Sequence, residues 1–123
     1  MISARRPDAA RAVAESIGVS AGQWPPPPGS WDLLVNATPI GSRAVPGCPL
    51  ESIRTRALVY DLVYEPDPTE LMQAAARADC DVIGGIEMLI AQAERQFELW
   101  IGQRPPEGLF REAAARAMRT RES

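Results

Sequence analysis

Histidine and lysine are both absent from this chain of 123 residues, so arginine supplies all 13 basic side chains. The absence of histidine excludes the usual imidazole-based zinc sites. A carbonyl or alcohol redox step needs a group that exchanges a proton near neutral pH, and histidine and lysine are the common ones. Tyr60, Tyr64 and perturbed carboxylates remain as alternatives, but none stands in an obvious acid–base pair. We therefore expect no catalytic proton-transfer residue within this chain.

Long apolar runs and an excess of positive charge are missing as well. No apolar stretch is long enough to cross a bilayer, and Met1 is not followed by the charged and apolar regions of a secretion signal. The net charge of −3 and the pI near 5.0 argue against general nucleic-acid binding. Cys48 and Cys80 form no metal-binding pattern and are expected to be reduced, partly buried thiols. We expect a cytoplasmic protein that binds no membrane, nucleic acid or metal.

Helical and strand patterns alternate along the chain, which has the length of one domain. Apolar residues at helical spacing predict helices over 7–17, 67–78, 86–101 and 109–117, the second capped by Asp67. Strands are predicted at 1–4, within 19–31, and at 33–36, 57–63 and 80–83. The segment 57–63 is almost wholly apolar, so we expect it to be buried on both faces. Such alternation indicates an α/β fold, a parallel sheet covered by helices.

Two segments carry the chemistry. The apolar run before Asn36 ends abruptly in Ala37-Thr38 and then a Pro and a Gly, which is typical of a buried strand whose carboxyl end opens onto a ligand crevice. The second segment has a glycine pair, which allows a close backbone approach, followed by a helix on which Met88 and Gln92 share one edge at i, i+4 spacing. Together they suggest a nucleotide-dependent site.

Four sequence motifs, in order and at matching spacings over residues 1–118, resemble the C-terminal half of the shikimate dehydrogenase family. The motifs are Val35-Asn36-Ala37-Thr38-Pro39-Ile40-Gly41; Tyr60-Asp61-Leu62-Val63-Tyr64 with Pro66; Gly84-Gly85 with Met88-Leu89 and Gln92-Ala93; and Phe97, Trp100 and Gly102. The resemblance implies part of a Rossmann-like domain that binds NADP, and an enzyme that reduces 3-dehydroshikimate to shikimate, a small-molecule substrate of aromatic amino acid biosynthesis.

The resemblance also implies roles for individual residues. It assigns these cofactor-binding residues: Arg5, Arg6, Asn36, Ala37, Thr38, Asp61, Leu62, Gly85 and Met88. Tyr64 and Gln92 are implied to lie toward the substrate. Arg5 and Arg6 favour NADP because a guanidinium meets the adenosine 2′-phosphate well, whereas NAD is usually held by an acidic residue.

Each assignment has a structural alternative. The segment after Asn36 could be a simple turn, and Gln92 could reach solvent. Tyr64 could pack on its neighbouring proline. Asp61 ends a buried strand, where an unpaired charge would be costly, so it must either reach a partner at the sheet edge or cap a neighbouring turn. Gly85 could serve the turn that leads into its helix.

The chain departs from the family pattern in several places. Glu65 stands where the family usually has Asn, Asp79 where it has Gly, and Glu87 where Gly is common. Glu87 falls in the first turn of a helix, so it could simply serve the helix dipole. These changes leave open the substrate identity and the cofactor affinity.

Two parts of the family enzyme are missing. No glycine-rich phosphate loop occurs, and neither does the N-terminal domain with its Lys–Asp proton-transfer pair. We therefore expect residues 1–123 to be the C-terminal part of a dinucleotide-binding domain, truncated before its first strand. Because that strand lies at the centre of the Rossmann order, we expect residues 1–30 to pack poorly or to dock against the wrong edge.

Three functions remain open at this point. The first is an NADP-dependent shikimate dehydrogenase fragment that is inactive alone. The second is a quinate or shikimate dehydrogenase that uses NAD. The third is a non-catalytic remnant or binding module that complements a separate N-terminal half, with a homodimer as a further arrangement.

Overall fold

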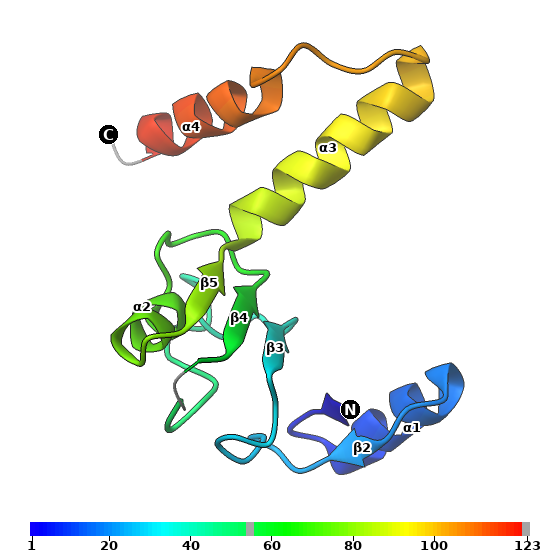
Figure 1. The fold of residues 1–123 in the computed structure, drawn as a ribbon, viewed down its shortest axis with the longest axis vertical. Coiled ribbons are helices and arrows are strands. Elements are labelled where there is room, and N and C mark those ends of the chain that lie inside the picture. Colours follow the sequence, from blue (N-terminus) through cyan, green and yellow to red (C-terminus); the bar gives the residue numbers. More distant parts are fainter. Residues whose placement is uncertain (54–55, 122–123) are drawn as a thin grey trace.

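The computed structural model describes residues 1–53 and 56–121 and has two parallel sheets flanked by helices (Figure 1). The smaller sheet pairs β1 (Ile2–Ser3) with β2 (Ala21–Gly22). The larger one, called the main sheet below, has the order β3 (Leu33–Asn36), β4 (Leu58–Asp61), β5 (Asp81–Ile83). The helices are α1 (Pro7–Ile17), α2 (Glu70–Arg77), α3 (Gly85–Ile101) and α4 (Leu109–Arg121). The α/β class is confirmed.

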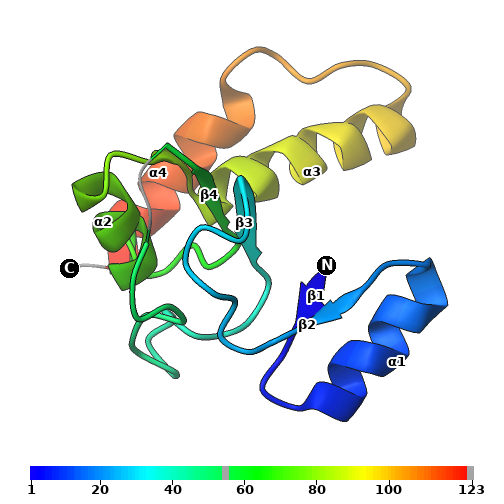
Figure 2. The same cartoon turned by 60° about the horizontal axis from the view of Figure 1, so that its bottom comes forward.

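Residues 1–22 form an N-terminal unit with a small core of its own. Helix α1 connects β1 to β2 and buries Ala10 and Ala14. It ends at Gly18, whose left-handed backbone (φ 70°) lets its N–H bond back to the last helical turn. The unit lies on the β3 side of the main sheet in two views (Figures 1 and 2), but within the described residues its strands pair only with each other. It therefore does not dock on the edge of the main sheet.

One face of the main sheet carries the core. Leu34, Val59 and Val82 lie side by side across the three strands in register. Helix α2 packs over them and contributes Leu71 and Ala75, both completely buried. Parallel strands joined through a helix on one side place that helix on this face, so the apolar positions of α2 and of the strands point toward each other.

The opposite face of the main sheet is much less covered. Leu33 and Val35 lie beside Leu58 and Tyr60 in the strand register. The first two are exposed and the second two are only half-buried. The expectation that the strand at 57–63 is buried on both faces is therefore wrong, because α2 covers one face and, within the described residues, no helix packs comparably on the other.

Helices α3 and α4 form a hairpin that leaves the sheet. Figure 1 shows α3 running away from β5 and α4 returning alongside it. Phe97 and Phe110 join the two helices edge to face, with ring centroids 5.9 Å apart. The outer end of α3 is exposed, Trp100 included, so only part of its predicted apolar stripe is buried. None of the described helices is both long and apolar enough to span a membrane.

The core assignment can be tested with two leucines. Leu71→Ala removes a side chain with no exposed surface, so the free energy of unfolding should fall by about 2–5 kcal/mol. The same truncation at Leu99, which is 66% exposed, should change it by less than about 0.5 kcal/mol. Urea unfolding followed by circular dichroism measures both. Equal losses would contradict the placement of the core.

Candidate functional site

The carboxyl ends of β3 and β4 are joined by two polar side chains. Asn36 and Asp61 are register partners at the last position of the two strands, and both are buried. The Nδ2 of Asn36 donates to Oδ1 of Asp61 at 2.9 Å and to the carbonyl oxygen of Ile40 at 3.0 Å. Alternation along the strands puts both side chains on the covered face of the main sheet, where they must be hydrogen-bonded to each other or to the backbone.

Asp61 has no exposed surface, and its carboxylate is held by further protein donors. Its Oδ1 also accepts from the backbone N–H of Val63 at 3.1 Å, and its Oδ2 accepts from the hydroxyl of Thr69 at 2.6 Å. The sequence left two roles open for Asp61, a partner at the sheet edge or a cap for a turn. The structure shows both, since Asp61 bonds Asn36 on the neighbouring strand β3 and also caps the turn that follows β4. Any part that Asp61 takes in a ligand site is through the residues it holds.

Asn36 also holds the turn that follows β3 through hydrogen bonds. Its Oδ1 accepts from the N–H of Thr38 at 3.1 Å and from the Thr38 hydroxyl at 2.7 Å. The hydroxyl oxygen of Thr38 in turn accepts from the N–H of Ile40 at 3.2 Å. The segment after β3 is therefore a hydrogen-bonded turn with a fixed shape, and the small, exposed Ala37 leaves space above it.

Thr69 is the member of this cluster that sequence reasoning missed. It is completely buried, and its hydroxyl accepts from the N–H of Met72 while donating to Asp61. Thr69 is thus the N-cap of α2, which begins at Glu70, and the prediction of Asp67 as the cap is wrong. Threonine is a common cap residue, so the sequence could have suggested this role. The bond from Thr69 to a carboxylate eight positions earlier depends on the tertiary fold and could not be read from the sequence.

Gly85 brings the start of α3 against the end of β4. A Cβ atom at this position would lie 2.6 Å from the carbonyl carbon of Leu62 and 2.8 Å from that of Val63, with the Leu62 oxygen nearer still. Only glycine allows this approach. The structure therefore brings together six residues that the resemblance assigns to a cofactor site: Asn36, Ala37, Thr38, Asp61, Leu62 and Gly85. Met88, half-buried, lies one turn further along α3.

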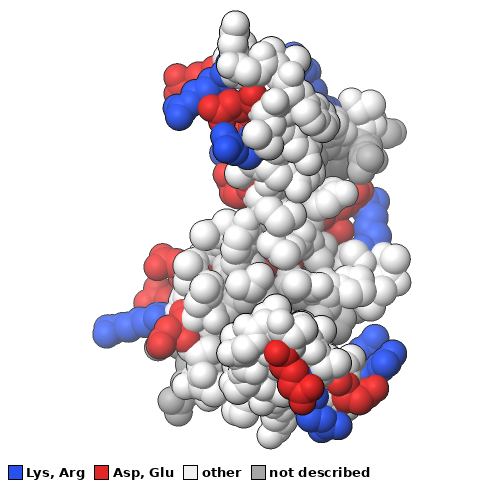
Figure 3. Space-filling model, turned by 90° about the vertical axis from the view of Figure 1, so that its right-hand side faces the viewer, with Lys and Arg blue, Asp and Glu red and all other residues white. Residues whose placement is uncertain are grey.

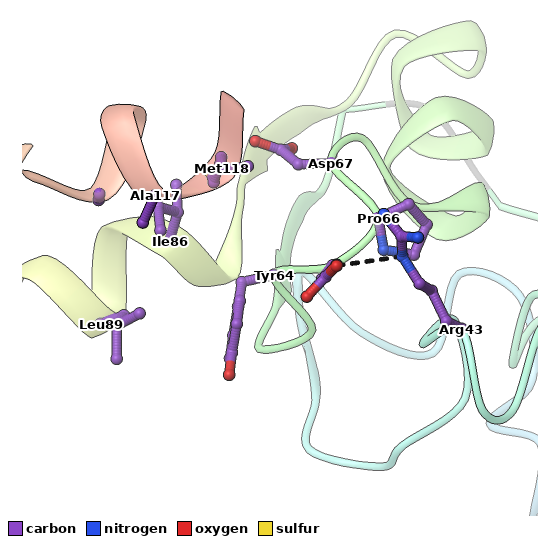
Figure 4. Close-up of a pocket in the computed structure, with 10 residues that line it drawn as sticks. Arg43, Tyr64, Pro66, Asp67, Ile86, Leu89, Ala117 and Met118 are labelled. Carbon is purple, nitrogen blue, oxygen red and sulfur yellow. Dashed lines mark ion pairs between the residues drawn. The ribbon is translucent and has the colours of Figure 1, made fainter. Parts of the chain in front are cut away.

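A cavity of about 230 Å³ lies next to this cluster, between the segment after β4, the first turns of α3, and α4 (Figure 4). Tyr64, which is 43% exposed, and its neighbour Pro66 both line it. Arg43 and Glu65 form an ion pair of 3.1 Å at one side. The remaining lining residues are Asp67, Ile86, Leu89, Ala114, Ala117 and Met118.

Three of the assigned residues lie away from the cluster. Arg5 and Arg6 are exposed at the start of α1 in the N-terminal unit, where Arg6 contacts Asp8 at 3.3 Å. Gln92 is exposed on α3, about two helical turns beyond Gly85. The structure thus assembles the middle of the expected site and leaves its two ends apart.

Glu87 has a role that the sequence did not show. In the first turn of α3 it accepts two hydrogen bonds of 2.7 Å from Arg111 of α4. The guanidinium lowers the pKa of the Glu87 carboxyl below its ordinary value. This departure from the family pattern therefore joins α3 to α4, which forms one wall of the cavity.

The thiols and carboxylates show no metal centre in the described part of the chain. Cys48 and Cys80 are both half-buried, as expected, and burial raises the pKa of the Cys48 thiol. Within residues 1–53 and 56–121, no three side chains of the His, Cys, Asp or Glu type come together as a metal site would need.

Comparison with known proteins gives consistent matches. The family model for the shikimate 5′-dehydrogenase C-terminal domain matches residues 85–115. The shikimate dehydrogenase (NADP(+)) of Archaeoglobus fulgidus is 43% identical over 97 residues, which are 74% of this chain and 35% of that protein. The chain spans about a third of the length of such curated relatives.

Two solved structures are similar in fold and sequence. The shikimate 5-dehydrogenase from Thermus thermophilus, in complex with NADP(H) and shikimate, superposes with a TM-score of 0.80 at 33% identity, over 94% of this chain and 44% of that one. The quinate dehydrogenase from Corynebacterium glutamicum, in complex with NAD, gives a TM-score of 0.70 at 31% identity, over 86% of this chain and 41% of that one.

The hydroxyl of Thr69 can be tested by an isosteric change. Thr69→Val removes the bond to Asp61 and the cap of α2, so the free energy of unfolding should fall by about 2–3 kcal/mol. Thr69→Ser keeps the hydroxyl and should lose less than half as much. Urea unfolding of the unchanged chain and of the two variants measures these losses. Equal losses for the valine and serine variants would show that the hydroxyl contributes little.

The Glu87–Arg111 pair predicts a pH-dependent contact between α3 and α4. Because the folded-state pKa of Glu87 is lowered, the pair stabilises the contact above the ordinary carboxyl pKa of about 4.3 and is lost as the pH falls through the lowered value. Arg111→Gln should therefore speed amide exchange in α4 at pH 6 but not near pH 3, after correction for intrinsic rates. Arg116→Gln, also exposed on α4, is the control and should match the unchanged chain at both pH values. A difference that persists at low pH would contradict the pairing.

Proposed function

Because this chain belongs to the shikimate dehydrogenase family and matches about a third of the length of a curated relative, we propose that it supplies one wall of an NADP-dependent site where 3-dehydroshikimate is reduced to shikimate. The observation that supports this most strongly is the cluster at the carboxyl ends of β3 and β4. There Asn36, Thr38 and Gly85 are fixed around the buried Asp61. The carboxyl ends of parallel strands are where such folds bind dinucleotides.

The residues present fit a dinucleotide on this wall. Ala37 is small and exposed, and the turn that carries it has a fixed shape, so a flat ring can lie above it without ordering the protein further. Leu62, Gly85 and Met88 would continue the wall from the end of β4 onto α3. NADPH supplies a hydride when bound. In this proposal the chain's own residues orient the cofactor and shield it from water on one side.

The N-terminal unit would hold the adenosine end. Arg5 and Arg6 are both exposed, and bidentate guanidinium groups bind a phosphate well. Several curated relatives are named as NADP(+) enzymes. The second candidate, a quinate dehydrogenase that uses NAD, is favoured by the likeness to the Corynebacterium glutamicum enzyme but disfavoured by the two arginines.

Substrate would meet the chain at the cavity. Tyr64 lines it, and Gln92 lies further along α3, the helix whose first turns line it. We assign no proton-transfer role to any residue of the chain. The glycine-rich phosphate loop and the proton-transfer pair would come from polypeptide corresponding to the part of the relatives outside the matched region. Residues 1–123 would then be the C-terminal part of a dinucleotide-binding domain.

The test is an assay of NADP+-linked oxidation of shikimate by the chain, alone and co-expressed with the unmatched N-terminal part of the Archaeoglobus fulgidus enzyme. We expect activity only in the co-expressed pair. Activity of the chain alone would refute its incompleteness. A stable pair without activity on shikimate or quinate would refute the proposed reaction.

Cofactor choice gives a sharper prediction. In the active pair, Arg5→Gln should raise the KM for NADP+ by about 10- to 100-fold, the effect of losing one hydrogen-bonded charge contact, and should leave the KM for NAD+ unchanged. Arg11→Gln, exposed on α1, the helix that follows Arg5, is the matched control and should change neither value. Equal losses for both cofactors would contradict the assignment of Arg5 to the 2′-phosphate.

A further inference from the structure

The ion pair of Arg43 and Glu65 lines two cavities at once. Besides the cavity of about 230 Å³ described above, a second one of about 400 Å³ lies between the loop at 42–44 and the segment after β4. The two cavities share three lining residues, which are Arg43, Tyr64 and Glu65. The family resemblance assigns no role to Arg43, and Glu65 departs from the family pattern, so the pair needs an explanation of its own.

Arg43 is the cation that a ligand in either cavity would meet. Within the described part of the chain it is the only positively charged lining residue, and its side chain is 64% exposed. The contact of 3.1 Å joins its Nε to Oε1 of Glu65, and neither Nη1 nor Nη2 bonds another described residue. These two outer nitrogens form a fork that matches the geometry of a carboxylate, and they are open to a ligand.

The backbone that carries Arg43 has a fixed shape. Ser42 and Val45 bridge each other, and the N–H of Val45 donates to the carbonyl oxygen of Ser42 at 3.1 Å. The N–H of Gly41 donates in turn to the carbonyl oxygen of Val45 at 2.8 Å. Gly41 lies against the buried cluster, since a Cβ atom there would be 3.9 Å from Oδ2 of Asp61. Arg43 therefore projects from a closed turn that rests on the same cluster as the candidate site.

The smaller cavity offers an apolar wall away from the ion pair. Figure 4 shows Ile86 and Leu89 of α3, with Met118 of α4, on the other side of Tyr64 from Arg43. A ligand that spans this cavity would place an apolar ring against the helices and an anionic end at the guanidinium. Apolar contact supplies affinity in such a pocket, while a few polar groups fix the orientation of the ligand. The chemistry of the lining thus suits a cyclic carboxylic acid.

The geometry points to Arg43 as the residue that binds the carboxylate of such an acid, with Glu65 as a positioning residue that orients the guanidinium through Nε. The lining also carries Asp67, so it has two acidic groups and one basic group. Arg43 must therefore attract the carboxylate more strongly than the acidic groups repel it, and single charge changes test this directly. That the acid is the substrate rests on the proposed function, whereas the carboxylate site itself does not.

The first experiment titrates the chain alone with benzoate and with benzamide, and follows its backbone amide signals by NMR. The two probes have nearly the same shape, but only benzoate is charged. Benzoate should shift the amides of Arg43, Tyr64 and Glu65 and bind at least about fivefold more tightly, the effect of one solvent-screened charged hydrogen bond. Arg43→Gln should remove this preference. Equal affinities for the two probes, or no shift with either, overturn the proposal.

Arg104 provides the matched control. Its Nε lies 3.6 Å from Oε1 of Glu98, so it repeats the arginine–glutamate contact away from both cavities. Figure 3 shows charged side chains of both signs at the top of the molecule, where α3 ends. Arg104→Gln should keep the preference for benzoate. The same loss in Arg104→Gln as in Arg43→Gln would assign the preference to overall charge and would overturn the proposal.

Glu65→Asp tests the positioning role without changing the charge. The shorter side chain can no longer hold Nε at 3.1 Å, so the affinity for benzoate should fall at least about threefold although the lining charge is the same. An unchanged affinity would show that Glu65 does not orient Arg43, and would overturn that part of the proposal.

The second experiment asks whether the acid is the substrate. In the active pair with the N-terminal part of the Archaeoglobus fulgidus enzyme, Arg43→Gln should raise the KM for shikimate at least about fivefold and leave the KM for NADP+ unchanged. An unchanged KM for shikimate would overturn the identification of the acid with the substrate. If the unchanged pair is inactive, the proposed function fails, and the benzoate titration still decides the carboxylate site.

Discussion

The buried carboxylate of Asp61 is the constraint on which the rest of this structure depends. A charge without contact to water is costly unless donors surround it, and Asp61 obtains them from three elements: β3 through Asn36, its own turn through Val63, and α2 through Thr69. Each of these donors is therefore held in place by its hydrogen bond to the Asp61 carboxylate. The strand ends, the turn after β3 and the start of α2 form a single rigid cluster.

This rigidity fixes the shape of the surface formed by the turn after β3 and the start of α3. Asn36 transmits the position of Asp61 to Thr38, and Gly85 lets α3 begin directly on the backbone after Asp61. The small, exposed Ala37 lies in the turn beside this cluster, and α4, joined to α3 through Arg111, forms one wall of the neighbouring cavity. The N-terminal unit, which carries Arg5 and Arg6, has its own small sheet, separate from the main sheet.

The sequence predicted the locally determined elements well. Helix α1 was predicted over 7–17 and β3 over 33–36 because proline, glycine and apolar spacing mark their ends within a few residues. What failed depends on contacts distant in sequence. Thr69 bonds a carboxylate eight residues earlier, and Glu87 meets an arginine 24 residues later. The strand at 57–63 was expected to be covered on both faces because it is almost wholly apolar, but composition cannot show which faces the rest of the chain packs against, and in the structure α2 covers one of them.

The most direct test of the central claim is a titration of the co-expressed pair with NADPH, followed by the backbone amide signals of this chain in NMR spectra. The account predicts that Ala37, Thr38, Gly85 and Met88 shift together with one saturation curve, because the cofactor lies on the wall that Asp61 holds. Saturable shifts confined to other parts of the chain, with these four amides unchanged, would contradict it.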